Sequence, residues 1–440
     1  MKILLTISLL ATFLLSVVFP KNEHSMDGKK FPEYIAEWLI ADQLISQGLV
    51  EDAMVQIEKI YLLAKADENH PQLYKCLLKI ETLAVQKDEL GQKGIIKRLE
   101  EKSKTLKEPS LSLLKSVLGE LYFNLSQNSY YGRGGKTDVQ GIEQDTADLD
   151  SWSNVNLIKS SNKFYLSSIQ ADELKKAGTE DYKSILDLKN DQLYRPVLFD
   201  VLAHRAIAHF ANVQSSLVTF GQEIKPANQF APVEQYLQLD FEPGSVWSLF
   251  QKVIAFHRQN MQLEAVIDAN LARLKYAYHL NAGSEEFQIM YLNALGEFES
   301  TLRSSSQKDL VRLDLIEYYY SNAVTQESQI PTPKTKYLIK VDSICKSMLS
   351  TSDTTLKNKI SAYQSLIRKL DFNINLEEVN LPGKPFRMLV QHRNLNELNF
   401  KIYKLTPTNV DLNPGVEQDQ LITYFLKQKP IRQWKDQWQP

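Results

Sequence analysis

Apolar side chains recur at intervals of three and four residues along most of this chain, and this spacing constrains its fold more than any other feature. Over residues 31–370 the spacing is interrupted only by turns and loops, and it predicts a succession of amphipathic α-helices. At Asp371 the period changes to two, which is typical of β-strands. We therefore expect a mainly α-helical protein with a short β-segment at its C-terminal end.

The helical part divides into two predicted regions. Residues 31–125 read as helical hairpins joined by short turns. The order of small and large residues from Trp38 to Tyr61 is similar to that of tetratricopeptide (TPR-like) hairpins, without matching one consensus of about 34 residues throughout. A polar, Gly-rich loop is expected at 126–155 and a second helical region at 156–370. Antiparallel helices of this kind stack on their neighbours and leave an extended surface for a partner.

Glycine, proline and asparagine positions predict where the helices end. We expect Gly48 to cap the first helix, and Gly91 and Gly94 to separate the third helix from a charged one. A loop-like stretch is expected at 219–232. The helices expected in the second region lie at about 156–174, 182–188, 196–210, 246–257, 263–278, 285–302, 308–323, 337–349 and 354–370.

The segment 371–440 is expected to open a β-sandwich. Its three predicted strands lie at 372–379, 386–390 and 398–405. Three strands cannot cover their own apolar faces, so a second sheet is required. The last ten residues include Trp434 and Trp438 and do not resemble a polar tail. We therefore expect this chain to be the front part of a longer protein.

The first twenty residues read as an export signal. One basic residue, Lys2, precedes an uncharged run at 3–19 that Pro20 ends. This arrangement predicts a signal peptide over 1–20 and a location in the periplasm or cell envelope. The run of about 17 residues is also just long enough for a membrane anchor. A buried helix fits it least well, because the run has no polar periodicity.

Charge and cysteine content limit the classes of partner. The chain has 51 basic and 53 acidic residues, a formal net charge of -2, so we expect no attraction to nucleic acid. Cys76 and Cys345 lie far apart in helical segments. Export would permit a disulfide between them, but isolated cysteines in a large chain are more often small buried apolar residues. Neither cysteine has the spacing of a metal site.

Two segments are similar to known binding motifs, one to a phosphate-binding loop and one to a metal site, but neither has the required spacing. Residues 132–137 end like a phosphate-binding loop, but Tyr130 occupies the position of its first glycine and no apolar strand precedes it. His204 and His209 are five positions apart, which places them about 140° apart around a helix and makes a shared metal unfavourable. We expect both histidines, and His257 by itself, to be packed helix residues.

A third segment, Gly-Val-Glu-Gln at 415–418, is similar to the thioester motif of complement-like proteins, in which a cysteine thiol condenses with a glutamine amide three residues later. Gly415 occupies the cysteine position, so no thioester can form there. The charged stretch at 97–107 is most simply a solvated helix face. We predict no catalytic, cofactor-binding or metal-binding residue in this chain, and no enzymatic activity.

Several strings spread along the chain carry a family resemblance. They lie at 49–53 (LVEDA), 58–61 (EKIY), 193–196 (LYRP), 199–202 (FDVL), 268–276 (DANLARLKY), 379–386 (VNLPGKPF) and 398–405 (LNFKIYKL). Together they make the chain resemble the N-terminal region of the large alpha-2-macroglobulin-like proteins of Bacteroidetes-type bacteria. The resemblance implies a long exported chain, in which a helical lead region precedes many macroglobulin β-sandwich domains.

The resemblance also implies a function for the intact protein. It would be a protease trap, an endopeptidase inhibitor that protects the envelope, in which cleavage of a bait segment drives closure around the protease. The bait region and the thioester would lie beyond Pro440, so this chain would be a non-catalytic scaffold with proteases or envelope proteins as partners. The alternative is a stand-alone helical-repeat adaptor that binds a protein partner in the cell envelope.

Overall fold

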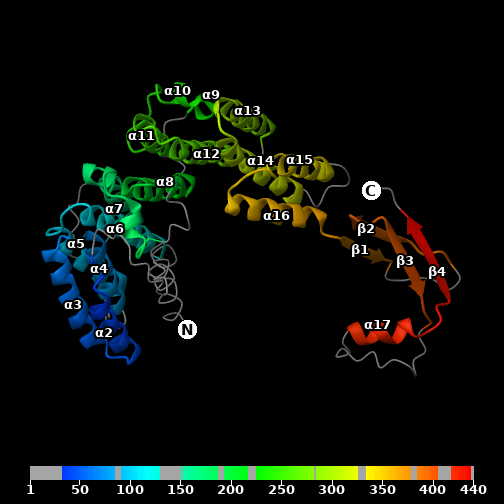
Figure 1. The fold of residues 1–440 in the computed structure, drawn as a ribbon, viewed down its shortest axis with the longest axis horizontal. Coiled ribbons are helices and arrows are strands. Elements are labelled where there is room, and N and C mark those ends of the chain that lie inside the picture. The colour runs from blue at the N-terminus through cyan, green and yellow to red at the C-terminus, as the bar shows by residue number, and fades with distance from the viewer. Residues whose placement is uncertain are drawn as a thin grey trace. The chain divides into compact units, whose positions relative to one another are not determined.

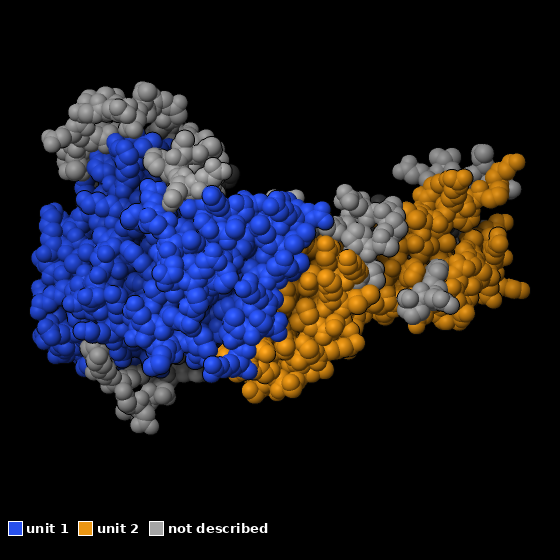
Figure 2. All heavy atoms as spheres, turned by 90° about the horizontal axis from the view of Figure 1, so that it is seen from above, with its two compact units in different colours: residues 1–303 blue, residues 304–440 orange. Residues whose placement is uncertain are grey.

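The computed structural model describes residues 32–84, 91–128, 149, 152–186, 193–216, 224–281, 284–325, 333–377, 384–404 and 418–437. This part of the chain is mainly helical, with short antiparallel strands toward the C-terminus, as predicted. The chain forms two compact units, residues 1–303 (unit 1) and 304–440 (unit 2), shown in different colours in Figure 2. The division between them falls inside the predicted second helical region.

Unit 1 consists of α-helices joined mostly by short connections (Figure 1). Its first helices are α2 (Ile35–Ser46), α3 (Val50–Ala66), α4 (His70–Ala84), α5 (Gly91–Ser103), α6 (Ser110–Asn128) and α7 (Asn154–Ser167). They are followed by α8 (Leu198–Ser216), the one-turn helices α9 (Pro226–Gln229) and α10 (Val233–Tyr236), α11 (Val246–Gln259), α12 (Leu263–Leu280) and α13 (Glu285–Thr301). Many of these helices pack on the next one in the sequence, from α2 on α3 to α12 on α13.

The turn after α2 shows how local sequence sets this packing. Gly48 has a φ of 75°, a left-handed conformation that favours glycine. The Gly48 N–H donates to the Ile45 carbonyl at 3.0 Å, and the Leu49 N–H donates to the Leu44 carbonyl at 3.0 Å. These are the two hydrogen bonds of a Schellman cap, so the predicted role of Gly48 is confirmed. The resulting reversal of the chain puts Trp38 into a core shared with α3 and α4.

Helices α6 and α7 approach each other closely at Gly119. A Cβ atom at this position would lie 2.8 Å from Cδ2 of the Tyr165 ring on α7. The Ser161 hydroxyl, also on α7, donates a hydrogen bond to the Gly119 carbonyl at 2.6 Å. The close contact therefore depends on the missing side chain.

Unit 2 begins with the helices α14 (Ser305–Thr325), α15 (Pro333–Ser347) and α16 (Thr354–Arg368), each packed on the next. Asp353 caps α16, because its carboxylate accepts the N–H groups of Thr355 at 2.7 Å and Leu356 at 3.1 Å. The buried apolar residues of α15, α16 and their connection are Val341, Cys345, Met348, Leu356 and Ile360. This small core is formed from helical-period positions, as the sequence predicts.

The strands of unit 2 form two separate antiparallel pairs. Strand β1 (Asp371–Leu376) pairs with β2 (Met388–Arg393), and β3 (Glu397–Ile402) pairs with β4 (Arg432–Gln437). A short helix, α17 (Gln418–Leu426), lies between β3 and β4 in the sequence. The register places Phe400 opposite Trp434, and their rings stack with centroids 4.9 Å apart.

Some predicted boundaries were wrong. Gly91 begins α5 after α4 has ended at Ala84, but Gly94 does not separate the two helices, because it lies inside α5 on its buried face. In its described part, the helix predicted at 182–188 is replaced by the end of a 3-10 helix, η2 (Thr179–Tyr182), and a turn at 183–185. A backbone bridge between Gly178 and Val197 fixes this turn, and that long-range pairing has no local sequence signal.

Other differences concern short elements. The stretch at 219–232, predicted as a loop, contains the single turn α9. The three predicted strands are present with shifted ends, but β4 and α17 were missed. Strand β4 has the sequence RQWKDQ, in which one aromatic residue among polar neighbours gives little alternation.

Candidate functional site

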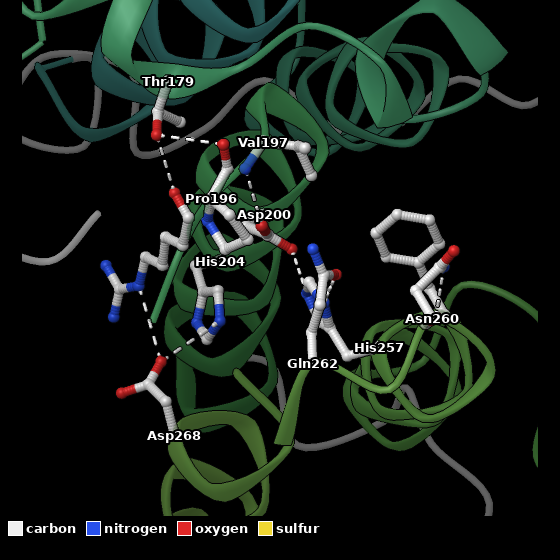
Figure 3. Close-up of polar contacts among 11 residues, drawn as sticks. Thr179, Pro196, Val197, Asp200, His204, His257, Asn260, Gln262 and Asp268 are labelled. Carbon is white, nitrogen blue, oxygen red and sulfur yellow. Dashed lines mark hydrogen bonds and ion pairs between the residues drawn. The ribbon is translucent and has the colours of Figure 1, made fainter. Parts of the chain in front are cut away.

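A buried ion pair joins α8 to α11 in unit 1. Asp200 Oδ1 lies 2.5 Å from His257 Nε2, and both side chains are 1% exposed. Asp200 stands in the first turn of α8, where its other oxygen accepts the Val197 N–H at 3.1 Å. His257 Nδ1 lies 2.7 Å from Gln262 Oε1, just before α12. The pair therefore ties α8, α11 and the start of α12 together at one point, as Figure 3 shows.

This arrangement does not resemble a catalytic dyad. Both ring nitrogens of His257 already have hydrogen-bond partners, the Asp200 carboxylate at Nε2 and the Gln262 side chain at Nδ1. A general base needs one nitrogen free to accept a proton from a substrate or nucleophile. Among the described residues, no hydroxyl or thiol is hydrogen-bonded to this ring, so the nucleophile of a Ser-His-Asp type arrangement is missing.

A second polar cluster joins the other part of α8 to α12. His204 Nε2 lies 3.7 Å from Asp268 Oδ2, and Arg195 Nε lies 3.5 Å from the same oxygen. Burial lowers the pKa of His204 to about 3, and the nearby charges of Arg195 and His257 act in the same direction. His204 is therefore neutral at pH 7, and Arg195 is the charged partner of Asp268. The cluster holds the segment before α8 against α12 (Figure 3).

His209 lies against α7, whereas His204 lies against α12. Its ring stacks on Tyr165 of α7 with centroids 4.3 Å apart, and its Nε2 lies 2.6 Å from Asn162 Oδ1. Burial lowers the pKa of His209 to about 4, so this ring is also neutral at pH 7. The structure thus directs His204 toward α12 and His209 toward α7. His257, in contrast, was expected to stand alone and instead pairs with a residue 57 positions earlier.

The remaining candidate segments do not assemble into a site. The signal segment at 1–20 and the phosphate-loop-like residues 132–137 lie outside the described residues. Of the thioester-like segment only Gln418 is described, as the first residue of α17. Cys76 and Cys345 are free and buried, in unit 1 and unit 2 respectively.

Within the described ranges, no group of His, Cys, Asp and Glu side chains has the arrangement of a metal site. No helix in those ranges has both the length and the apolar character needed to span a bilayer.

A pocket of about 430 Å³ lies in the second half of unit 1, a size typical of small-molecule sites. The residues that line it come from the segment after α9, from α10, α11, α12 and α13, and from the two residues after α13. Its apolar lining includes Phe230, Leu263, Val266, Leu274, Phe298 and Leu302. Its charged lining consists of Arg258, Arg273, Arg303, Glu234 and Glu297. Sequence reasoning missed this pocket, because its walls come from four stretches of sequence, 230–234, 258, 263–274 and 294–303, that only the fold brings together.

No protein-family model, no curated protein and no solved structure matches this chain.

Proposed function

We propose that this chain is the non-catalytic helical scaffold of an exported alpha-2-macroglobulin-like protein, which in its intact form traps proteases and protects the cell envelope. The observation that carries the proposal is the exposed apolar face of the first sheet. Phe372 and Leu376 of β1 are each 56% exposed, and Ile374 between them is 36% exposed. These alternate residues share one face of the strand.

The partner strand extends the same face. The register places Ile374 opposite Val390 and Leu376 opposite Met388, so apolar side chains are neighbours across the pair. The opposite face carries Asn373, Asn375 and Gln391 together with Leu389, and is more polar. A two-stranded sheet with one apolar face is marginal by itself and is stabilised when another sheet packs on it. A macroglobulin-type β-sandwich would provide that second sheet.

The helices support the scaffold part of the proposal. The buried side chains of α2, α3 and α4 form one core from helices that pack in sequence order. This packing in sequence order supports an array of TPR-like hairpins, which would present side chains on their outer surface. In the intact protein, the helical array would hold the β-domains or dock a partner.

The first experiment is an immunoblot of fractionated cells with an antibody raised against residues 32–303. The macroglobulin proposal predicts a species far larger than 50.5 kDa in the envelope fraction. A species at or just below 50.5 kDa would contradict the proposal and favour an adaptor.

The large species should then be purified and mixed with trypsin. Closure around a protease excludes large substrates but admits small ones. We therefore expect trypsin to lose activity on a large protein substrate and to retain it on a small peptide substrate. If the purified protein leaves the activity of trypsin on both substrates unchanged, the protease-trap function is contradicted.

A second candidate function, the stand-alone adaptor, is favoured by the outer surface of the first hairpin. Several large apolar side chains there are more than two-fifths exposed: Ile35, Leu39, Ile40, Leu49, Val55, Leu62 and Leu63. Exposed apolar clusters of this kind are common on surfaces that bind proteins. The immunoblot above separates the two candidates, because the adaptor requires no larger species.

A further inference from the structure

Arg273 of α12 is a buried cation whose hydrogen-bond partners are all neutral. Its side chain is 1% exposed. Nη1 and Nη2 donate to the carbonyl oxygens of Gln229 and Ala231, each at 2.8 Å. Nη2 and Nε donate to Asn270 Oδ1 at 2.8 and 3.1 Å. The guanidinium carbon lies 4.2 Å from the centroid of the Tyr236 ring. Among the described residues, no carboxylate forms an ion pair with Arg273.

Two donor groups on this pocket wall have no acceptor in the described part of the chain. A guanidinium has five N–H groups, and the contacts above use four, leaving one on Nη1. Asn270 is also 1% exposed, and its Oδ1 accepts from Arg273 while its Nδ2 donates to no described residue. Both residues line the pocket. Asn270 Nδ2 is not among the fully enclosed polar atoms that lack a partner, so it is reached from the pocket, and a ligand that supplies acceptor oxygens can take the place of water there.

The charged residues of the lining indicate whether the acceptor group of the ligand is neutral or anionic. Arg258 at the exposed rim forms an ion pair with Glu234, so these two charges offset each other. The remaining charged residues of the lining are Arg273, Arg303 and Glu297, two cations against one anion. Burial lowers the pKa of Arg273 to about 10, so it stays charged at pH 7 without an anion to compensate it. An anionic ligand therefore fits the base of this pocket.

The lining also limits the charge and shape of that anion. One buried guanidinium and one amide match the two oxygens of a single carboxylate, whereas a phosphate dianion usually needs more cations. The other walls are apolar, with Leu263, Val266, Phe298 and Leu302 among them. A ligand that fills the pocket must therefore have an apolar body attached to its charged group.

We propose that this pocket binds a monocarboxylate with an apolar tail, held by the free N–H of Arg273 Nη1 and the amide of Asn270. The tail lies against Phe298 and Leu302. A medium-chain fatty acid and the C-terminal residue of a peptide both present this chemistry. The proposal goes beyond the scaffold function and stands whether or not that function is correct.

Isothermal titration of the full chain with matched ligands tests the proposal. Octanoate and 1-octanol share a tail and differ in charge, and acetyl-Ala-Ala-Leu with a free carboxylate is compared with its C-terminal amide. We expect at least one carboxylate to bind at least about tenfold tighter than its neutral counterpart. If octanoate binds more tightly than the peptide, the ligand is a fatty acid; if the peptide binds more tightly, the ligand is a peptide C-terminus. Equal binding of charged and neutral ligands, or no saturable binding by any of them, would overturn the proposal.

Three substitutions test whether the ligand binds in this pocket. Arg273→Gln should weaken carboxylate binding by at least about tenfold and leave 1-octanol binding unchanged. Arg258→Gln removes the same charge from the exposed, ion-paired rim, and should change binding by less than about threefold. Ala294→Trp fills the pocket without altering the partners of Arg273, and should abolish binding of both ligand types.

Circular dichroism checks that each variant is folded, because Arg273 also anchors the backbone at Gln229 and Ala231. If Arg273→Gln does not fold, the ligand comparison on the wild type and the Ala294→Trp variant still decide the proposal. Unchanged carboxylate binding in folded Ala294→Trp would show that the ligand binds elsewhere.

Discussion

Glycine has opposite roles at two helix positions, and the difference comes from what faces each one. At Gly119 an added Cβ would lie 2.8 Å from the Tyr165 ring, whereas at Gly296 on α13 nothing lies within 4 Å. We expect Gly119→Ala to lower the free energy of unfolding by about 1–3 kcal/mol, because α6 and α7 must separate. Gly296→Ala should raise it by about 0.5–1 kcal/mol through helix propensity. Urea denaturation measures both, and the same sign for both variants would contradict the close contact.

The ion pair between Asp200 and His257 makes a second prediction. Asp200→Asn removes the carboxylate that pairs with buried His257, which should cost about 3–5 kcal/mol of unfolding free energy. The control is Glu101→Gln, which breaks the exposed pair with Lys104 and should cost less than about 0.5 kcal/mol. Chemical denaturation measures both variants. Similar small losses would mean that Asp200 and His257 are not a buried pair in solution.

His209 predicts how stability depends on pH. Its pKa is lowered to about 4 by burial, whereas in the unfolded chain a histidine titrates near about 6.5. Between these values the unfolded state binds more protons, so stability falls as the pH falls from about 6.5 to 4. His209→Gln keeps a side-chain donor for Asn162 and removes this titration. The slope of unfolding free energy against pH should decrease by up to about 1.4 kcal/mol per pH unit. Parallel slopes for wild type and variant would contradict the buried neutral state.

Residue-level pairings are the part that the sequence predicted least well. Nothing local marks Asp200 and His257 as partners, because they are 57 positions apart and on different helices. The only sequence signal is an acidic residue beside apolar Phe199 and Leu202 near a helix start. Capping by Gly48, in contrast, depends on a few consecutive residues and was predicted correctly.

At the level of elements, two aromatic residues of the strands should differ in how much they contribute to stability, because one ring is exposed and the other is packed. Phe372→Ser should change the free energy of unfolding by less than about 0.5 kcal/mol, because the ring is 56% exposed. Phe400→Ser is the matched control, and should cost about 1 kcal/mol or more because its ring stacks on Trp434. Binding of the dye ANS should decrease in Phe372→Ser. A large destabilisation by Phe372→Ser would show that another part of the protein covers this face.

Long helices were predicted within a few residues, because their apolar period persists over several turns. Helix α12, expected at about 263–278, spans Leu263–Leu280. Elements of one or two turns, such as η2 and α9, depend on tertiary contacts instead. The hydroxyl of Thr179, for example, donates to the carbonyls of Arg195 and Pro196, which hold η2 in place.

The whole molecule contains one thiol in each compact unit, and this allows unit 1 and unit 2 to be followed separately. Burial raises the pKa of Cys76 to about 12 and that of Cys345 to about 11, so neither thiolate forms in the native state near pH 8. We expect no labelling of the native protein by DTNB at pH 8, and labelling of both thiols in denaturing urea.

The single variants Cys345→Ser and Cys76→Ser leave one reporter each, for unit 1 and unit 2 respectively. Each remaining thiol should react only when its own unit unfolds. Rapid labelling without urea would contradict the buried positions of these side chains.

The division between the units was not predictable from the period of apolar residues. The period changes at Asp371, whereas the compact units divide after Arg303, between two helices of similar pattern. A local pattern reports which face of a helix is apolar, but not which neighbour covers it.

The packing of helices on their sequence neighbours has a consequence for how the chain acquires its structure during synthesis. When α3 has left the ribosome, α2 already has the surface that it needs, and α4 completes the core that contains Trp38. Contacts between neighbours require only short loops to close, so they form quickly. The apolar stripe of each new helix is therefore exposed only briefly, which limits the time in which nascent chains can aggregate or require a chaperone.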